Sequence, residues 1–132
     1  MAQFFAPTQI LNANNTVAFN GRTKRCCNVV HHDGSGLFTL HGGSCCNPAK
    51  YIVHLHVVVT AVTAAPKQFE LYVDGEPVAQ SLIALVPAAI GDVLSGDVTI
   101  SVESTCGCTK LAVHTLTTAD LTSAVINIDR VA

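Results

Sequence analysis

The chain has 132 residues, with seven Lys and Arg, nine Asp and Glu and a formal net charge of −2. Its charged fraction of 12% is about half that of an average soluble domain. This composition excludes a charged disordered tail, and the absence of a basic field argues against a nucleic-acid binder. Because soluble surfaces normally need charge, we expect copies of the chain or a larger assembly to cover much of this one.

Neither a secretory signal nor a membrane segment is expected from the sequence. The first residues lack a cationic segment followed by a sustained apolar one. The most apolar run, residues 57–65, is interrupted by Thr and is far shorter than the roughly 20 residues of a membrane-spanning helix. We therefore predict a protein made in the cytoplasm, with no membrane partner.

Alternation of side chains with a period of two dominates the chain and predicts β-strands. No stretch shows a helical period of 3.6, and residues 118–123 are expected to hold at most a turn. The predicted strands, in chain order, are Thr16–Phe19, Cys27–His31, Gly36–His41, Tyr51–Val59, Gln68–Val73, Glu76–Leu85, Asp97–Glu103, Lys110–Thr117 and Ala124–Val131.

The strand pattern predicts an all-β jelly-roll sandwich of about eight to nine antiparallel strands. Asp74-Gly75 lies between two apolar stretches and predicts a tight hairpin, and Pro77 just after it indicates an edge strand. We expect residues 16–132 to form a single jelly-roll domain. Residues 1–15 are expected to form an N-terminal arm, in which Phe4 and Phe5 either dock onto a neighbour or belong to a frayed end.

Six cysteines are candidates for disulfides, although disulfides are rare in a reducing cytosol. Adjacent cysteines in a strand point to opposite faces, so partners are expected across segments rather than within a pair. A tetrathiolate metal site and reduced thiols remain alternatives, but none of the pairs has the usual spacing of zinc ligands. The six residues are Cys26, Cys27, Cys45, Cys46, Cys106 and Cys108.

The histidines offer a weak metal candidate. His54 and His56 are two residues apart in a predicted strand, so both rings should project from one face. His114 or His41 could supply a third ligand. The favoured interpretation is that these histidines face solvent or an interface, and a pH-dependent interface is an alternative to the metal site. No metal is therefore assigned.

Motifs for catalysis or cofactor binding are missing from the sequence. It contains neither a Gly-x-Ser-x-Gly elbow nor a phosphate-binding glycine motif. Ser35 lies in Gly34-Ser35-Gly36, which is typical of a plain turn. We therefore expect no enzymatic activity, no catalytic residue and no cofactor.

Residues 26–132 resemble the C1q/TNF-like jelly-roll group, specifically small cysteine-containing phage-borne or related bacterial surface proteins. The resemblance is carried by the doubled cysteines, by HHDGSG (31–36), by Lys50-Tyr51 with the apolar strand that follows, by LYVDGEPV (71–78), by Cys106-Gly107-Cys108 and by AVINIDRVA (124–132). It implies a tight trimer with apolar strands packed around the threefold axis. The chain shows no Gly-X-Y collagen stalk, unlike spore-surface glycoproteins of the group.

The last strand is the predicted subunit interface. Val125, Ile126 and Ile128 place apolar side chains on both of its faces, which is typical of a strand that is buried on both sides. One face would meet the core of the sandwich and the other a neighbouring copy, with cyclic symmetry.

These observations lead to a structural hypothesis. We expect a trimeric virion protein of a bacteriophage that decorates or cements the capsid or forms a head fibre. It would be made in the host cytoplasm, bind the major capsid protein or other virion proteins, and finish exposed outside the cell. The alternatives are a spore-surface or extracellular filament subunit on a spore or cell surface, and a jelly-roll module that binds a glycan or receptor.

Overall fold

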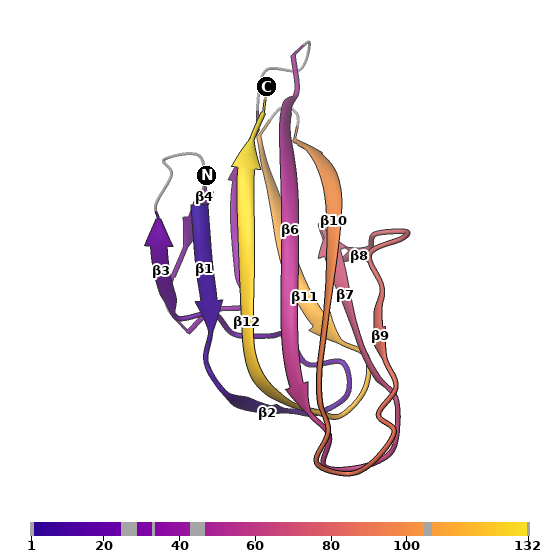
Figure 1. Cartoon of the computed structure of the whole chain (residues 1–132). Coiled ribbons are helices and arrows are strands. Elements are labelled where there is room, and N and C mark those ends of the chain that lie inside the picture. Colours follow the sequence, from indigo (N-terminus) through magenta and orange to yellow (C-terminus); the bar gives the residue numbers. More distant parts are fainter. Residues whose placement is uncertain (1, 25–28, 33, 43–46, 105–106, 132) are drawn as a thin grey trace.

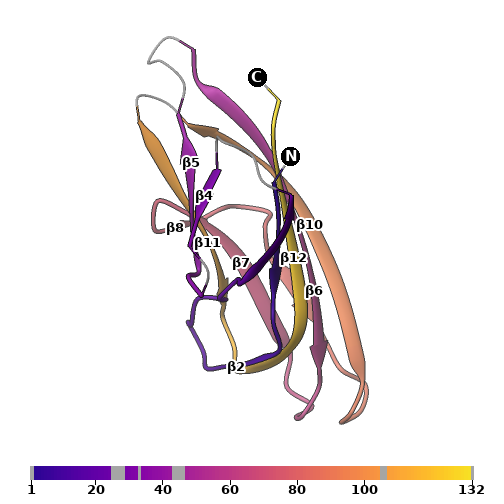
Figure 2. The same cartoon turned by 90° about the vertical axis from the view of Figure 1, so that its left-hand side faces the viewer.

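The computed structural model describes residues 2–24, 29–32, 34–42, 47–104 and 107–131. Within these residues the chain forms two six-stranded antiparallel sheets and no helix. The prediction of an all-β jelly-roll sandwich is confirmed, but the expected eight to nine strands are fewer than the twelve of the described residues. Figures 1 and 2 show the sheets as two layers, with both chain termini at the same end of the sandwich. No helix in the described part of the chain is long and apolar enough to cross a membrane.

Sheet 1 has the strand order β10-β6-β12-β1-β3, with β2 paired to β12. Its three longest strands, β6, β10 and β12, have 12 residues each and lie side by side in the sheet. The strands are β1 (Ala2–Ala6), β2 (Gln9–Leu11), β3 (Gly21–Lys24), β6 (Ala49–Thr60), β10 (Val93–Ser104) and β12 (Ala119–Arg130).

Sheet 2 has the strand order β4-β5-β11-β7-β8, with β9 paired to β7. Its strands are β4 (Val29–His31), β5 (Leu37–His41), β7 (Lys67–Val73), β8 (Glu76–Pro77), β9 (Ile83–Leu85) and β11 (Cys108–Thr115). The Asp74-Gly75 hairpin is confirmed, because both residues have positive φ, 51° and 84°. Pro77 lies at the sheet edge, as predicted.

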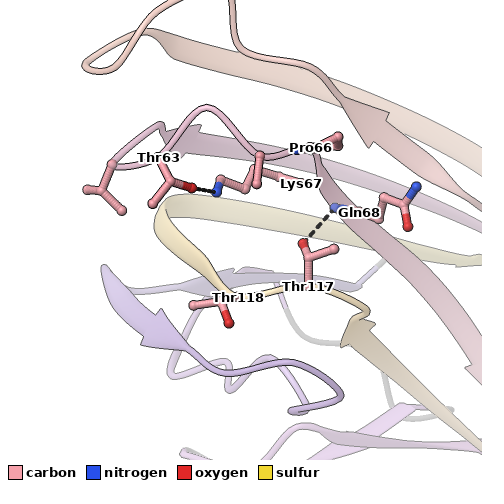
Figure 3. Close-up of a pocket in the computed structure, with 8 residues that line it drawn as sticks. Thr63, Pro66, Lys67, Gln68, Thr117 and Thr118 are labelled. Atoms are coloured by element: carbon pink, nitrogen blue, oxygen red, sulfur yellow. Dashed lines mark hydrogen bonds between the residues drawn. The ribbon is translucent and has the colours of Figure 1, made fainter.

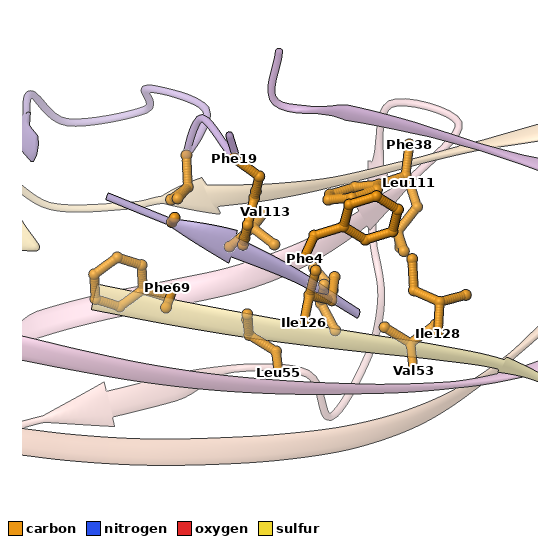
Figure 4. Close-up of a cluster of buried hydrophobic side chains, with 14 of the residues drawn as sticks. Phe4, Phe19, Phe38, Val53, Leu55, Phe69, Leu111, Val113, Ile126 and Ile128 are labelled. Atoms are coloured by element: carbon orange, nitrogen blue, oxygen red, sulfur yellow. The ribbon is translucent and has the colours of Figure 1, made fainter. Parts of the chain in front are cut away.

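The core lies between the sheets and follows the predicted alternation. In β6 the odd-numbered residues from 51 to 59 are fully buried, whereas His54 and His56 point to the outer side. Four rings, those of Phe4, Phe19, Phe38 and His31, pack together at one side of the core with centroid separations of 4.5–6.5 Å. Figure 4 shows Phe4 between the sheets, close to Phe38 and Ile126.

The structure places the predicted N-terminal arm inside sheet 1. β1 pairs with β12 on one side and β3 on the other, and β2 pairs with the start of β12. Phe4 is 3% exposed and belongs to the core. The sequence pattern did not predict these strands because β1 and β2 are short. Both form hydrogen bonds with β12, which lies more than 100 residues further along the chain.

Further boundaries differ from prediction, and the predicted strand Glu76–Leu85 is divided into the separate strands β8 and β9. Residues 118–123, expected to hold at most a turn, include the first residues of β12, which begins at Ala119. Thr16 and Phe19 form only isolated bridges, to His114 and Ser35, instead of a continuous strand. Short pairings of this kind depend on tertiary neighbours more than on local pattern.

Candidate interaction surface

The outer side of sheet 1 carries a group of side chains with no formal charge other than that of protonated histidine. They come from the three central strands β6, β12 and β1, whose inward residues fill the core. We call this group face 1; it consists of Phe5, Ile52, His54, His56, Val58, Val125 and Asn127. The large apolar side chains of Phe5 and Ile52 are 36% and 41% exposed.

Cross-strand pairing arranges these side chains in rows. His56 stands opposite Val125 on one side and Asp97 of β10 on the other, while Phe5 stands opposite Val125. Nε2 of His54 lies 3.3 Å from Oδ2 of Asp97, so the two groups form an ion pair when the imidazole is protonated.

One further polar contact joins a member of face 1 to a neighbour on β1. Gln3 Nε2 donates a hydrogen bond to Asn127 Oδ1 over 2.7 Å, so each of these two amides has a partner within the chain. A partner surface that covers this part of the sheet would leave these two amides hydrogen-bonded to each other.

The outer side of sheet 2 carries formal charges on its middle strands, β7 and β11. Lys110 and Glu70 place formal charges there, and Lys110 Nζ donates to Thr39 Oγ1 over 2.9 Å. The rings of Tyr72 and His114 stack with centroids 4.1 Å apart. Partial burial lowers the pKa of His114 below 6.5, because desolvation disfavours the charged imidazolium.

Only one of the three residues predicted at the subunit interface lies on face 1. Ile126 and Ile128 are 0% and 1% exposed and point into the core of the same chain, opposite Leu55 and Val53 of β6. Val125 points outward. The assignment of Ile126 and Ile128 to a subunit contact is therefore corrected, because side chains buried within the protomer are not available to a partner.

His54 and His56 share one face, as their spacing predicts, but the suggested third ligands lie elsewhere. His114 and His41 belong to sheet 2, on the other layer of the sandwich. Within the described residues, no group of three or more His, Cys, Asp or Glu side chains is placed to hold a metal ion.

Of the six cysteines predicted as disulfide candidates, one lies within the described residues. Cys108 is exposed and free at the start of β11, with Sγ 3.6 Å from His41 Nδ1. Beside it, the backbone N–H of Gly42 donates to the carbonyl of Gly107 over 2.5 Å. Five predicted disulfide residues lie outside the described residues: Cys26, Cys27, Cys45, Cys46 and Cys106.

The sequence reasoning overlooked Lys67, a buried lysine beside a cavity of about 400 Å³. Figure 3 shows it reaching from the start of β7 toward Thr63. The signal was present in the sequence, because Lys67 shares the parity of Phe69 and Leu71, the inward residues of a strand that was predicted one residue too short.

Comparison with known proteins shows the fold and no closer relationship. No family model and no curated protein matches the sequence. Eiger TNF from S. frugiperda superposes with a TM-score of 0.73 at 13% identity, over 99% of this chain and 91% of that one.

Two other solved structures also superpose over nearly the whole chain. The globular domain of zebrafish complement 1qA protein gives a TM-score of 0.65 at 16% identity, over 100% of this chain and 98% of that one. Murine APRIL at pH 5.0 gives a TM-score of 0.64 at 11% identity, over 95% of this chain and 96% of that one. The chain thus has the C1q/TNF jelly-roll fold.

Proposed function

We propose that this protein is a non-catalytic structural module that assembles with copies of itself, as a trimer, through face 1. The single observation that carries the proposal is the composition of this face, whose central side chains are apolar, amide or imidazole groups. Exposed apolar side chains grouped on one face are typical of surfaces that meet another protein. A homo-oligomer with cyclic symmetry supplies such a partner without a second gene product.

The contrast between the two sheets supports the choice of face. Sheet 2 presents Lys110 and Glu70 to its outer side, where burial against a neighbour would require both charges to be desolvated. On sheet 1 the outward-facing carboxylates nearest to face 1 lie at its border: Asp97 on the edge strand β10 and Asp129 near the end of β12. The seven members of face 1 itself include no Lys, Arg, Asp or Glu. The resemblance to the C1q/TNF-like group, which implies a trimer, supports the same stoichiometry.

The proposed setting is the surface of a bacteriophage particle, where the trimer decorates or cements the capsid or forms a head fibre. The support is the resemblance to small phage-borne surface proteins, together with the low charge and the six cysteines. In this setting disulfides among the cysteines outside the described residues would make the assembly durable once it leaves the cytoplasm.

Self-association is tested by the molar mass of the purified chain in solution, measured by light scattering after size exclusion. We expect the mass of three chains at micromolar concentration, and monomers for Val125→Glu, which places a carboxylate in the middle of face 1. Val30→Glu is the matched control, because Val30 is 40% exposed on β4 of sheet 2. A monomeric native chain, or equal effects of the two variants, would contradict the proposal.

The particle setting has a separate test. Purified phage particles from a host that carries the gene are analysed by peptide mass spectrometry and labelled with antibody against the chain. We expect its peptides in the particles and label on the capsid surface. Their absence from particles would remove the virion setting and leave the self-association result intact.

A further inference from the structure

We propose that the cavity beside Lys67 is a binding site for a small organic carboxylate, held by the Lys67 ammonium and neighbouring threonine hydroxyls. The cavity lies between the β6–β7 and β11–β12 connections (Figure 3), which are at the end of the sandwich opposite the termini (Figure 1). The inference is independent of face 1.

The first step is the position of the lysine itself. Lys67 occupies an inward position of β7, in line with Phe69 and Leu71, and is only 2% exposed. Lysine is almost never fully buried without a partner for its charge. A methionine or leucine would fill the same inward position without any charge to desolvate.

The second step is the partner of the ammonium. Nζ donates to Thr63 Oγ1 over 2.8 Å, which accounts for one of its three N–H donors. In the described part of the chain, no carboxylate lies within 4.0 Å of Nζ. Since a neutral hydroxyl does not balance a charge, an anion in the cavity is the group that would stabilise this arrangement.

The third step is the cavity that adjoins it. Its volume of about 400 Å³ lies within the range of small-molecule sites, roughly 300–1,000 Å³. Val62, Ala65 and Pro66 supply apolar contacts, while Thr117 and Thr118 add hydroxyls. No acidic residue lines the cavity, so Lys67 is its one charged lining residue among those described.

The walls of the cavity are held together in advance. The backbone N–H of Gln68 donates to Thr117 Oγ1 over 3.1 Å, and Leu116 N–H donates to the Gln68 carbonyl over 2.8 Å. These bonds connect β7 to the β11–β12 connection, so the two sides of the cavity keep their spacing. A preformed site loses less ordering entropy when a ligand binds.

The chemistry of the lining selects the class of ligand. One lysine balances a single negative charge, which suits a carboxylate better than a phosphate monoester with a charge of about −1.5 to −2 at neutral pH. The apolar wall favours a ligand with a carbon body. Free aliphatic acids and acidic sugars share this chemistry, and the experiment distinguishes them.

The test is a titration of the isotope-labelled protein followed by amide NMR. The probes are pentanoate and N-acetylneuraminate, each compared with a neutral counterpart, pentanamide and N-acetylglucosamine. We expect at least one carboxylate to shift the amides of residues 62–68 and 116–118 with a Kd in about the millimolar range or tighter. The neutral counterparts should bind at least about tenfold more weakly.

Variants connect the binding to the lysine. Lys67→Met should weaken binding at least about tenfold, since a charged hydrogen bond is lost. Lys110→Met is the matched control, because Lys110 makes the same bond to a threonine, Thr39, on the exposed side of sheet 2. Ala65→Trp obstructs the cavity from an exposed loop residue and provides a second test if Lys67→Met does not fold.

The outcomes separate clearly. Binding of N-acetylneuraminate alone identifies an acidic sugar as the ligand, binding of pentanoate alone identifies an aliphatic acid, and both results support the site. The proposal is overturned if neither carboxylate shifts these amides at about ten millimolar, or if the neutral counterparts bind equally well. It is also overturned if Ala65→Trp or a folded Lys67→Met retains the native affinity.

Discussion

The rings of Tyr72 and His114 lie face to face on neighbouring strands of sheet 2, with centroids 4.1 Å apart and an interplanar angle of 16°. His114 Nε2 is also 3.5 Å from Thr16 Oγ1, and Glu70 stands opposite His114 in the strand register. The partial burial that comes with this stack lowers the pKa of His114 below 6.5.

This stack predicts a loss of stability in mild acid. The unfolded chain takes up a proton near pH 6.5, whereas folded His114 resists protonation, so the free energy of unfolding falls as the pH drops through and below that value. His114→Phe keeps an aromatic partner for Tyr72 and removes the titration. We expect its free energy of unfolding to fall less than that of the native chain between about pH 8 and pH 5. Equal slopes in urea unfolding would contradict the prediction.

A second prediction concerns the N-terminal strand. Phe4→Ala should lower the free energy of unfolding by about 3–5 kcal/mol, because it leaves a cavity beside Phe38 and Ile126. Phe5→Ala should cost only about 1 kcal/mol, because Phe5 is 36% exposed on the outer side. Denaturant titration at a concentration where both variants are monomeric gives the comparison. Similar small losses for the two variants would indicate a loosely attached arm.

The third prediction tests how closely the two sheets approach. A Cβ at Gly96 of β10 would lie 2.7 Å from Ile83 Cγ2 and 3.0 Å from Leu85 Cδ2. Ile83 is buried and β-branched, so its methyl group cannot easily move away. Gly96→Ala should therefore lower the free energy of unfolding by about 1–2 kcal/mol.

The control for this prediction is the adjacent residue. Ser95 is exposed on the outer side of the same strand, so Ser95→Ala should change stability by no more than about 0.5 kcal/mol. Thermal unfolding of both variants provides the measurement. A neutral or stabilising effect of Gly96→Ala would show that β9 can move away from β10.

The fourth prediction concerns the thiol of Cys108. Because Cys108 is free and exposed, iodoacetamide should alkylate it in the native protein without reductant. Peptide mass spectrometry identifies the modified residue, with Cys108→Ser as the control for the assignment. If Cys108 becomes reactive only after reduction, it takes part in a disulfide.

Much of the fold could be predicted from alternation and turn chemistry. The buried odd-numbered residues of β6 and the hairpin at Asp74-Gly75 follow from local sequence, because side-chain period and positive φ are local properties. The spacing of His54 and His56 likewise placed both rings on one face. None of these three predictions required knowledge of the neighbouring strands.

The last strand shows where local pattern was insufficient. Val125, Ile126 and Ile128 are all apolar, and the sequence does not say which of them face the core. The register shift between Leu121 and Ser123 reverses the parity, so that even-numbered residues point inward beyond it. A bulge of this kind inserts one residue against the partner strand and depends on pairing with β6.

By itself, the sequence determined the fold class, the strand faces of the long hairpins and the scarcity of charge. Only the tertiary structure decided that Phe4 belongs to the core, that Val125 and not Ile126 lies on face 1, and that Lys67 adjoins a cavity. The physical reason is the same in each case. Side-chain direction along one strand is local, whereas burial depends on which distant strand lies beside or across from it.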